Sequence, residues 1–317
     1  MIFSKIIGVG SYLPQKILTN QDLEKILNTT DEWITTRTGI KQRHIVTDAQ
    51  LTSDLALEAS LKAIDNAGID KNDIDLIIVA TTTPDKIFPS TACILQSKLN
   101  IEECPAFDIQ AVCTGFIYAL AVANNFIKTK SANNVLIVGA ETMSKITDYQ
   151  DRSNAILWGD GAGAVVLSSS ATEGILSTHI HSEGKYKHLL HVSKKECNGV
   201  IKERIEMQGN QVFKIAVNML DKIVDETLVA NNLSKKDIDW IVPHQANIRI
   251  LEATAKKLEM SMDKVIVTID MHGNTSAASI PLALDKGVKE NKIHPGQLIL
   301  MEAFGGGFTW GSALMRL

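Results

Sequence analysis

The sequence predicts a layered α/β fold made of two related halves, and three observations support this prediction. Segments of similar sequence recur in the same order about 164 residues apart. Short apolar runs alternate with helix-like patterns, as in sheets whose parallel strands are connected by helices. Each half closes with a glycine-rich turn followed by an apolar strand. The 317 residues are enough for two domains, and we divide them into residues 1–170 and 171–317.

Four pairs of segments form the repeat. They are Leu55–Asn66 with Ile215–Ala230, Lys71–Val79 with Lys235–Val242, Phe107–Ile109 with Ile269–Met271, and Val135–Val138 with Leu298–Met301. Asp75 aligns with Asp239 at an offset of 164 residues, and the last two pairs have offsets of 162 and 163. Because order and spacing both recur, we interpret the chain as a duplicated unit.

The individual elements follow from residue patterns. Helical periodicity predicts helices over Leu55–Asn66, Ser90–Leu99, Gly115–Thr129 and Ile215–Ala230. Ile74–Thr81 and Val135–Val138 are continuous apolar runs, typical of strands buried on both faces. Gly159–Gly163 leads into the apolar strand Ala164–Leu167. Since a dinucleotide-binding loop opens a helix instead, we interpret these glycines as positions of close packing.

Composition excludes several classes of protein. Hydrophobic residues make up 45% and charged residues 21%, as in ordinary globular proteins. The net charge of −4 gives no general attraction to nucleic acid or to anionic membranes. The longest mostly apolar segment, Gly115–Ala123, is far shorter than the ~20 residues of a membrane span. With no signal peptide and no Cys-x-x-Cys pair among the four cysteines, we expect a cytoplasmic protein with reduced thiols.

Cys113 has the sequence context of a nucleophile. It follows the apolar stretch Ala106–Val112 and precedes the helical pattern that begins at Gly115, which predicts a strand-to-helix junction. The positive end of a helix dipole lowers the pKa of a thiol, and the thiolate is the reactive form. A small core residue is the alternative interpretation, since an unpaired cysteine is often just buried. The other cysteines lack this context: Cys93, Cys104 and Cys197.

Two polar residues of the second half are candidates for the same site. His244 follows the apolar strand Trp240–Val242, and catalytic groups of α/β folds often lie at such carboxyl ends. Asn274 lies 161 residues after Cys113, so the duplication places it near the counterpart of the cysteine. The counterpart of His244 is Ala80, which carries no reactive group. A turn or capping role is the alternative for each residue alone, whereas the three together indicate a shared pocket.

Several motifs resemble those of the condensing enzymes, and most closely the β-ketoacyl-ACP synthase III family. They are Trp33–Ile40, Ala111–Gly115, His244–Asn247, Gly273–Ser279 and Glu302–Leu314. The resemblance covers essentially the whole chain. It implies the thiolase fold, with two related halves, mixed and mostly parallel sheets in αβαβα layers, and a homodimer.

The resemblance also implies the reaction. Acetyl-CoA would acylate Cys113, and malonyl-ACP would then lose carbon dioxide and attack the acetyl group to give acetoacetyl-ACP. The N–H groups of Cys113 and Gly306 would hold the oxyanion, and His244 and Asn274 would donate hydrogen bonds to the malonyl thioester oxygen. The His–Asn pair favours condensation over thiolysis, which uses a second cysteine. No metal or redox cofactor is implied, because decarboxylation supplies the driving force, and the CoA thioester counts as a substrate.

Further binding residues are implied by the same motifs. Those that match CoA contacts of the family are Trp33, Arg37, Arg152 and Asn247. Phe88 matches an acyl-pocket residue that the partner subunit supplies, and its bulk favours short starters such as acetyl. Those expected to receive the acidic carrier protein are Arg249, Gln245, Lys214, Lys256 and Lys257. Ordinary helix-surface charge explains the three lysines equally well.

The resemblance weakens in two segments. Met143–Asp151 with Ser153 departs from the family pattern near the CoA and acyl sites, which leaves the starter range open. Lys185–Arg204 is also individual. His179 and His181 are spaced to face one way on a strand, but no cysteine and no family site accompanies them, and we expect no metal there.

Three other functions remain as alternatives. A specialised synthase of the same superfamily would use another starter or extender. A noncatalytic acyl-CoA-binding or carrier-binding protein would lack a catalytic group, whereas Cys113, His244 and Asn274 are all present. A cysteine hydrolase would need a triad, and no motif near His244 resembles one. The priming condensation is therefore the expected function.

Overall fold

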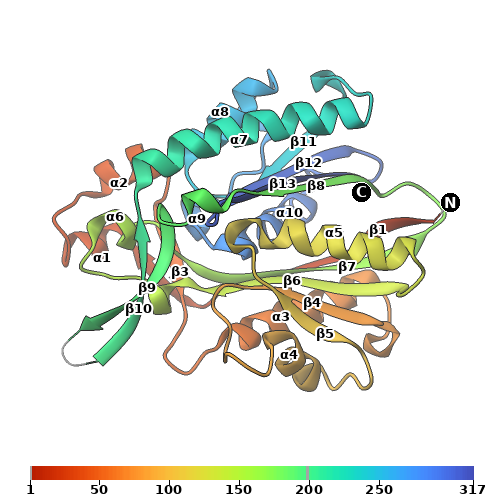
Figure 1. Cartoon of the computed structure of the whole chain (residues 1–317), viewed down its shortest axis with the longest axis horizontal. Helices are drawn as coiled ribbons and strands as arrows, with labels where there is room; N and C mark the ends of the chain where they lie inside the picture. The colour runs from red at the N-terminus through yellow and green to blue at the C-terminus, as the bar shows by residue number, and fades with distance from the viewer. Residues whose placement is uncertain (1, 198–199) are drawn as a thin grey trace.

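The computed structural model describes residues 2–197 and 200–317. Within these ranges, two large sheets and three pairs of helices form five layers, as expected from the sequence (Figure 1). One pair covers the outer face of each sheet, and the third lies between the sheets. From one outer face to the other, the helices are α3 (Thr52–Ala67) and α4 (Thr91–Leu99), α5 (Gly115–Lys128) and α10 (Ser279–Lys289), and α7 (Gly209–Ala230) and α8 (Ile248–Lys257).

The two sheets repeat one pairing pattern. The first has the order β1 (Phe3–Tyr12), β7 (Asp160–Ser170), β6 (Asn134–Thr142), β4 (Leu76–Ala80) and β5 (Ala106–Ile109). The second has the order β8 (Ile175–Ser182), β13 (Thr309–Arg316), β12 (Leu298–Gly305) and β11 (Trp240–Pro243). β4 and β6 pair in parallel, as do β11 and β12, and the closing strands β7 and β13 are antiparallel to both neighbours.

The sheets are mixed, but the expectation that most pairs are parallel is wrong because β7 and β13 are antiparallel to both neighbours. In the first sheet only the pairs around β4 are parallel, and in the second only β11 and β12 are. For β13, the reason is the length of its connection to β12. A parallel neighbour needs a crossover of a dozen or more residues, whereas β13 follows β12 after the short turn 306–308.

The duplication extends to individual hydrogen bonds. The backbone N–H of Asp75 donates to the carbonyl of Asn134 at 2.9 Å, and the N–H of Asn134 donates back to the Asp75 carboxylate at 2.9 Å. In the second half, Asp239 and Leu298 form the same two bonds, at 2.9 and 2.7 Å. Both pairs are related by the offset of 164 residues that the sequence indicated.

One aligned pair of segments is displaced by one residue, since Leu136 pairs with Ile77 as Leu300 pairs with Ile241, an offset of 164 and not 163. Another aligned pair is not equivalent. Phe107–Ile109 belongs to strand β5, whereas Ile269–Met271 lies in the short helix α9 (Ile269–His272). The structural counterpart of β5 lies near Val265, which bridges Ile241 in parallel as Ala106 pairs with Ile77. The connection that leads to this position is five residues shorter in the second half. An alignment at a nearly constant offset therefore matched β5 with residues that follow its true counterpart.

The remaining elements surround one end of the sheets. They are β2 (Lys16–Thr19), α1 (Asn20–Glu24), α2 (Asp31–Thr38), β3 (Gln42–Ile45), α6 (Arg152–Ala155), β9 (Leu190–Cys197) and β10 (Val200–Met207). The hairpin of β9 and β10 projects from the body at the lower left of Figure 1. None of the helices in the described ranges has the length and apolar character to cross a membrane.

Candidate active site

Equivalent strand-to-helix junctions of the two halves meet at the centre of the molecule. In the first half a short turn, Val112–Thr114, leads into α5 at Gly115. In the second half the turn Ser276–Ala278 leads into α10 at Ser279. Both turns begin with a left-handed residue, Val112 at φ 50° and Ser276 at φ 48°. The predicted placement of Cys113 at a junction is therefore confirmed.

The junctions also correct the expected counterpart of the cysteine. Since Val112 matches Ser276, Cys113 corresponds to Ala277, and Asn274 corresponds to Gln110 instead. Asn274 lies on the segment before the turn, where its backbone pairs with that of Trp158. The amide reaches the site from a different backbone position than the thiol does.

The left-handed Val112 is held by hydrogen bonds from the start of β13. A β-branched residue in this conformation costs on the order of 1–3 kcal/mol, which its surroundings must offset. The Thr309 hydroxyl donates to the carbonyl of Ala111 at 3.0 Å, and the Thr114 hydroxyl donates to the carbonyl of Thr309 at 3.1 Å. These bonds fix the turn that presents Cys113.

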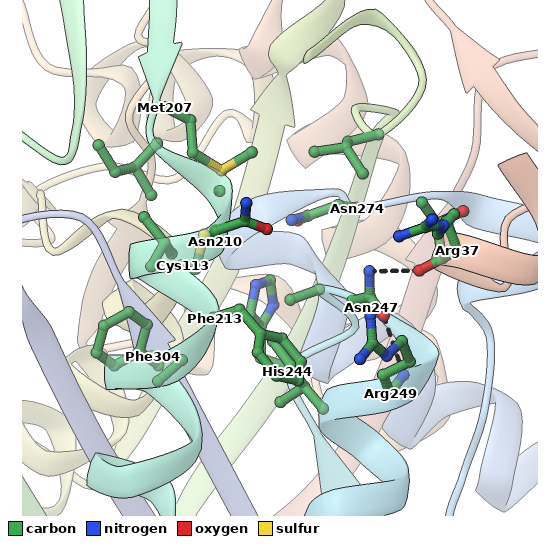
Figure 2. A pocket seen from close by; sticks show the side chains of 18 of the residues that line it. Arg37, Cys113, Met207, Asn210, Phe213, His244, Asn247, Arg249, Asn274 and Phe304 are labelled. Atoms are coloured by element: carbon green, nitrogen blue, oxygen red, sulfur yellow. Dashed lines mark hydrogen bonds between the residues drawn. The ribbon is translucent and has the colours of Figure 1, made fainter. Parts of the chain in front are cut away.

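Cys113, His244 and Asn274 line one pocket of about 660 Å³, as Figure 2 shows. Their exposed fractions are 3%, 6% and 5%. The Asn274 side-chain oxygen accepts a hydrogen bond from the backbone N–H of Ser276 at 2.9 Å. That bond orients the amide and leaves its NH₂ group as the donor available to a ligand. The three residues predicted from sequence thus share a site.

Hydrogen bonds hold both the backbone and the ring of His244. Its backbone N–H donates to the carbonyl of Glu302 at 2.8 Å, and its ring Nδ1 lies 2.6 Å from the hydroxyl of Ser279. Burial lowers the pKa of His244 to about 3, because water cannot solvate the charged ring. The imidazole is therefore neutral at physiological pH.

The thiol of Cys113 does not have the lowered pKa that its helix position predicts. The pKa of Cys113 is raised to about 12, mainly by burial; the Ser276 hydroxyl acts to lower it and the nearby Glu141 acts to raise it. Desolvation of a thiolate exceeds the effect of the helix dipole when no cation is in contact. The expectation of a resting thiolate is therefore wrong, and the Cys113 side chain is a neutral thiol at physiological pH.

Two buried acids near the site were missed by sequence reasoning. Glu141 accepts hydrogen bonds from the backbone N–H groups of Thr82 and Thr83, each at 3.1 Å, and burial raises its pKa. Glu302 lines the pocket and accepts from the Thr254 hydroxyl at 2.5 Å, and burial raises its pKa to about 8. In the sequence, each of these acids could have been recognised as a charged residue within an otherwise apolar strand pattern.

The predicted CoA residues lie at the mouth of the pocket. Trp33 and Arg37 line it, and the guanidinium of Arg152 lies over the Trp33 ring at 4.8 Å from its centroid. The Arg37 guanidinium lies 5.8 Å from the same centroid. A base can stack on Trp33 in the manner that the resemblance implies only after Arg152 moves away from the ring.

Asn247 has a structural role that its predicted role did not include. It is the N-cap of α8, where its side-chain oxygen accepts from the N–H of Arg249 at 3.0 Å. Its side-chain NH₂ donates to the carbonyl of Arg37 at 3.0 Å, as Figure 2 shows. These bonds join α2 to α8 at the pocket mouth, so Asn247 positions Arg37 and Arg249 on the same rim.

The predicted carrier patch is only partly available. Arg249 is exposed at the pocket mouth, with its guanidinium 5.0 Å from the Phe213 ring centroid, and Lys214 lines the same pocket. Lys256 is exposed on α8. Lys257 pairs instead with Asp221 at 3.1 Å and with Asp225 at 2.8 Å, so neighbouring acids neutralise its charge.

Gln245 was assigned to the carrier patch, and this assignment is wrong. Its side chain is fully buried. It donates to the carbonyls of Pro243 and Ile266 and accepts from the backbone N–H groups of Thr268 and Ile269. Because these four groups satisfy the amide, Gln245 joins the end of β11 to the segment after it and has no surface to offer.

A second pocket of about 330 Å³ adjoins the first. Trp158 and Leu190 line both pockets, and Met143 and Ile146 line the second. The segment around Met143 was expected to affect the starter range, and this position supports that expectation. Phe88 is 82% exposed and lines neither pocket of the single chain.

The first two turns of α7 were also missed. The predicted helix begins at Ile215, whereas α7 begins at Gly209, and Asn210, Val212 and Phe213 line the pocket. Val212 precedes Ala216 by four residues, so the periodic pattern extended further than predicted. These turns form one wall of the pocket.

His179 and His181 share a carboxylate. Their ring nitrogens lie 3.1 and 2.9 Å from the oxygens of Glu226, and the His181 ring stacks on Trp310. No cluster of three or more His, Cys, Asp or Glu side chains fit for a metal occurs in the part of the chain that is described. The side chain of Cys197 lies outside that part.

Comparisons with known proteins agree along the whole chain. Residues 107–184 match the family model 3-oxoacyl-[acyl-carrier-protein] synthase III, and residues 228–317 match the model of its C-terminal part. The chain is 61% identical to the β-ketoacyl-[acyl-carrier-protein] synthase III of Thiobacillus denitrificans, over 100% of both chains. It is 54% identical to that of Xylella fastidiosa, over 99% of this chain and 98% of the relative.

Solved structures agree as well. The 3-oxoacyl-[acyl-carrier-protein] synthase III of Aquifex aeolicus has a TM-score of 0.95 at 48% identity, covering 99% of this chain and 100% of its own. A priming β-ketosynthase of a polyketide biosynthetic pathway has a TM-score of 0.95 at 34% identity, covering 99% and 96%.

The chain belongs to the β-ketoacyl-[acyl-carrier-protein] synthase III family. It has the thiolase-like fold of this family. It is an acyltransferase, and its family condenses an acyl-CoA with malonyl-ACP to start fatty acid synthesis. The expectations for fold class and function that the motifs implied are thereby confirmed.

Proposed function

We propose that Cys113 is the residue that carries the acyl group of the starter. Its sulfur attacks the carbonyl carbon of acetyl-CoA and forms a new thioester as the bond to the CoA sulfur breaks. The proton of the thiol leaves with CoA in the overall exchange, which agrees with a raised Cys113 pKa. The observation that supports this role most directly is the position of Cys113 in the pocket that His244 and Asn274 also line.

The backbone around Cys113 is suited to hold the oxyanion that forms. A Cβ atom on Gly305 would lie 2.8 Å from the backbone nitrogen of Cys113, so the end of β12 approaches this N–H without a side chain between them. Gly306 follows at once. We assign the oxyanion contacts to the N–H groups of Cys113 and Gly306.

The second step uses His244 and Asn274 as donors. Decarboxylation of malonyl-ACP breaks the bond to the leaving carbon dioxide, and the electron pair becomes an enolate on the thioester. A neutral His244 and the free NH₂ of Asn274 both stabilise the negative oxygen by donating hydrogen bonds. The enolate carbon then attacks the acyl carbon on Cys113, the carbon–sulfur bond breaks, and the sulfur leaves as a thiolate that takes up a proton from water.

Acetyl is the proposed starter, and the chain is proposed to act as a homodimer. Trp158 and Leu190 separate the pocket at Cys113 from the second pocket, which limits the room for a long acyl group. Phe88 and its neighbour Ile87 are exposed, at 82% and 99%. Since Phe88 lines neither of these two pockets of its own chain, an acyl-pocket role for it requires a second copy. A specialised synthase that uses a longer starter is the alternative.

Two variants test the proposed nucleophile. Wild-type protein mixed with acetyl-CoA is expected to gain one acetyl group by intact-protein mass, and Cys113→Ala is expected to gain none. Condensation with malonyl-ACP should fall by at least about a thousandfold in Cys113→Ala, because the covalent step is lost. Cys93→Ala removes an exposed thiol on α4 and serves as the control. Acetylation of Cys113→Ala at the wild-type level would refute the assignment, and preferred loading of a longer acyl group would favour the alternative.

A further inference from the structure

Ser279 makes a buried contact with His244 that neither the motifs nor the comparisons explain. It is the first residue of α10, and its Oγ lies 2.6 Å from Nδ1 of the histidine. The exposed fractions of the two residues are 1% and 6%. The backbone N–H of Gln245 donates to the same hydroxyl oxygen at 3.4 Å.

The direction of the bond between Ser279 and His244 follows from the available partners. A hydroxyl has one proton to donate. The N–H of Gln245 can only donate, so it occupies an acceptor position of the oxygen. Among the described residues, Nδ1 of His244 is the one hydrogen-bond acceptor recorded for this hydroxyl. Leaving a buried hydroxyl proton unpaired costs about 1–3 kcal/mol, so Ser279 donates and Nδ1 accepts.

An accepting Nδ1 determines where the ring carries its proton. A neutral imidazole has one N–H and one bare nitrogen, and the two positions are distinct tautomers. With Nδ1 bare, the proton is on Nε2. No hydrogen bond to Nε2 is recorded in the described part of the chain, and the side chain lines the pocket. The donor of the ring is therefore available to a ligand.

We infer that Ser279 is a positioning residue that holds His244 in the tautomer whose Nε2–H donates to the malonyl thioester oxygen. The inference rests on the proposed role of His244 in the second step. It adds the residue that makes the imidazole a donor rather than an acceptor. Without the serine proton, the ring is free to carry its own proton on Nδ1 and to present a lone pair to the growing negative charge, which repels it.

The duplication shows that the fold does not need this polar pair. At the offset of 164 residues, His244 and Ser279 correspond to Ala80 and Gly115. Those two positions also touch, because a Cβ atom on Gly115 would lie 3.2 Å from that of Ala80. The first half therefore builds the same strand-to-helix contact from residues with no polar side chain. The His–Ser pair is confined to the half that supplies the proposed donors.

Ser279→Ala tests the inference by separating the two steps. We expect acetyl loading of Cys113 to stay within about twofold and condensation to fall about tenfold, the value of one hydrogen bond. Ser60→Ala is the matched control, since Ser60 is equally buried and bonds a backbone carbonyl on α3, far from the pocket in sequence and fold. Ser279→Thr retains the hydroxyl and is expected to recover condensation.

A direct measurement of the tautomer completes the test. In protein labelled with ¹⁵N-histidine, the His244 signals are assigned by their loss in His244→Ala. Wild type is expected to show a protonated Nε2 and a bare Nδ1, and Ser279→Ala a population with the proton on Nδ1. An unchanged tautomer, or equal losses of loading and condensation, would overturn the inference. If His244→Ala itself condenses at the wild-type rate, the proposed role of His244 fails, whatever the tautomer.

Discussion

The junctions Val112–Gly115 and Ser276–Ser279 share the same backbone conformation but carry different side chains. Both begin with a left-handed residue and both lead into a central helix. The first carries the thiol of Cys113, and the second carries the serine that contacts His244. Equivalent turns of the two halves thus carry different side chains beside the same pocket.

The strand ends show the same division. Val138 on β6 is fully buried and apolar, and its counterpart on β12 is the buried acid Glu302. The reverse holds three residues later, where Glu141 of the first half corresponds to Gly305 of the second. Because an acid occupies only one side of each pair, the two halves place their buried carboxyl groups at different positions along the strand. The comparison teaches that backbone symmetry does not predict where charge is placed.

The largest expected difference between the two halves follows from removing the amide side chain of Asn274. Asn274→Ala is expected to lower condensation about 10²–10³-fold, the usual cost of losing a donor to an oxyanion. Acetyl loading of Cys113 should remain, because Asn274 is assigned to the second step only. Gln110→Ala, at the equivalent position of the first half, is the comparison variant, and its condensation rate should fall much less. Equal losses in the two variants would contradict the assignment.

Reversing the charge at the pocket mouth is expected to have a smaller effect. Arg249 is exposed beside Phe213, and Arg249→Glu should raise the KM for malonyl-ACP about tenfold by repelling an acidic carrier. The effect should weaken at high salt, where screening reduces attraction between exposed charges. Lys236→Glu places the same charge far from the pocket and is the control. An unchanged KM would show that Arg249 does not take part in binding the carrier protein.

Glu302 predicts a pH dependence of stability that its counterpart Val138 cannot have. The pKa of Glu302 is raised from 4.5 to about 8. Between these values the folded state holds a proton that the unfolded state has lost, so this group makes stability fall as pH rises through that window. Glu302→Gln lacks the titration. Raising the pH from 4.5 to 8 should therefore lower the Tm of wild type relative to that of Glu302→Gln. A Tm difference that does not change with pH would contradict the raised pKa.

The smallest expected effect concerns the paired aspartates. Asp75 and Asp239 make the same bonds to the neighbouring strand, but Asp75 is exposed and Asp239 is half-buried. Asp239→Ala is expected to cost about 1–2 kcal/mol of unfolding free energy, and Asp75→Ala less, because water screens the exposed group. Urea denaturation measures both, with the exposed Asp48→Ala as a control. A larger loss at Asp75 would show that burial does not govern the two bonds.

The sequence alone was sufficient for the elements that local pattern determines. Continuous apolar runs correctly predicted β4 and β6, and the helical pattern at Gly115 placed α5. The aligned aspartates, Asp75 and Asp239, revealed the duplication, and each accepts the same hydrogen bond from the first residue of the neighbouring strand. Cys113, His244 and Asn274 could be grouped because strand ends and the repeat together place them at one edge of the sheets.

Other features depended on contacts between distant segments. The pKa of Cys113 could not be predicted from its helix position, since burial by both halves outweighs the dipole. Gln245 follows the histidine in an apparently accessible motif, yet four backbone groups from two segments enclose its side chain. The motif Gly273–Ser279 does not reveal a role for Ser279, because the contact of this residue with His244 joins positions 35 residues apart.

The raised pKa of Cys113 also determines how the resting enzyme tolerates its surroundings. Oxidants and alkylating agents react with thiolates far faster than with thiols. A thiol that is 3% exposed and has a pKa of about 12 is almost entirely protonated in a neutral solution. Cys113 is therefore held, in the resting protein, in the protonation state that reacts slowly with oxidants and alkylating agents.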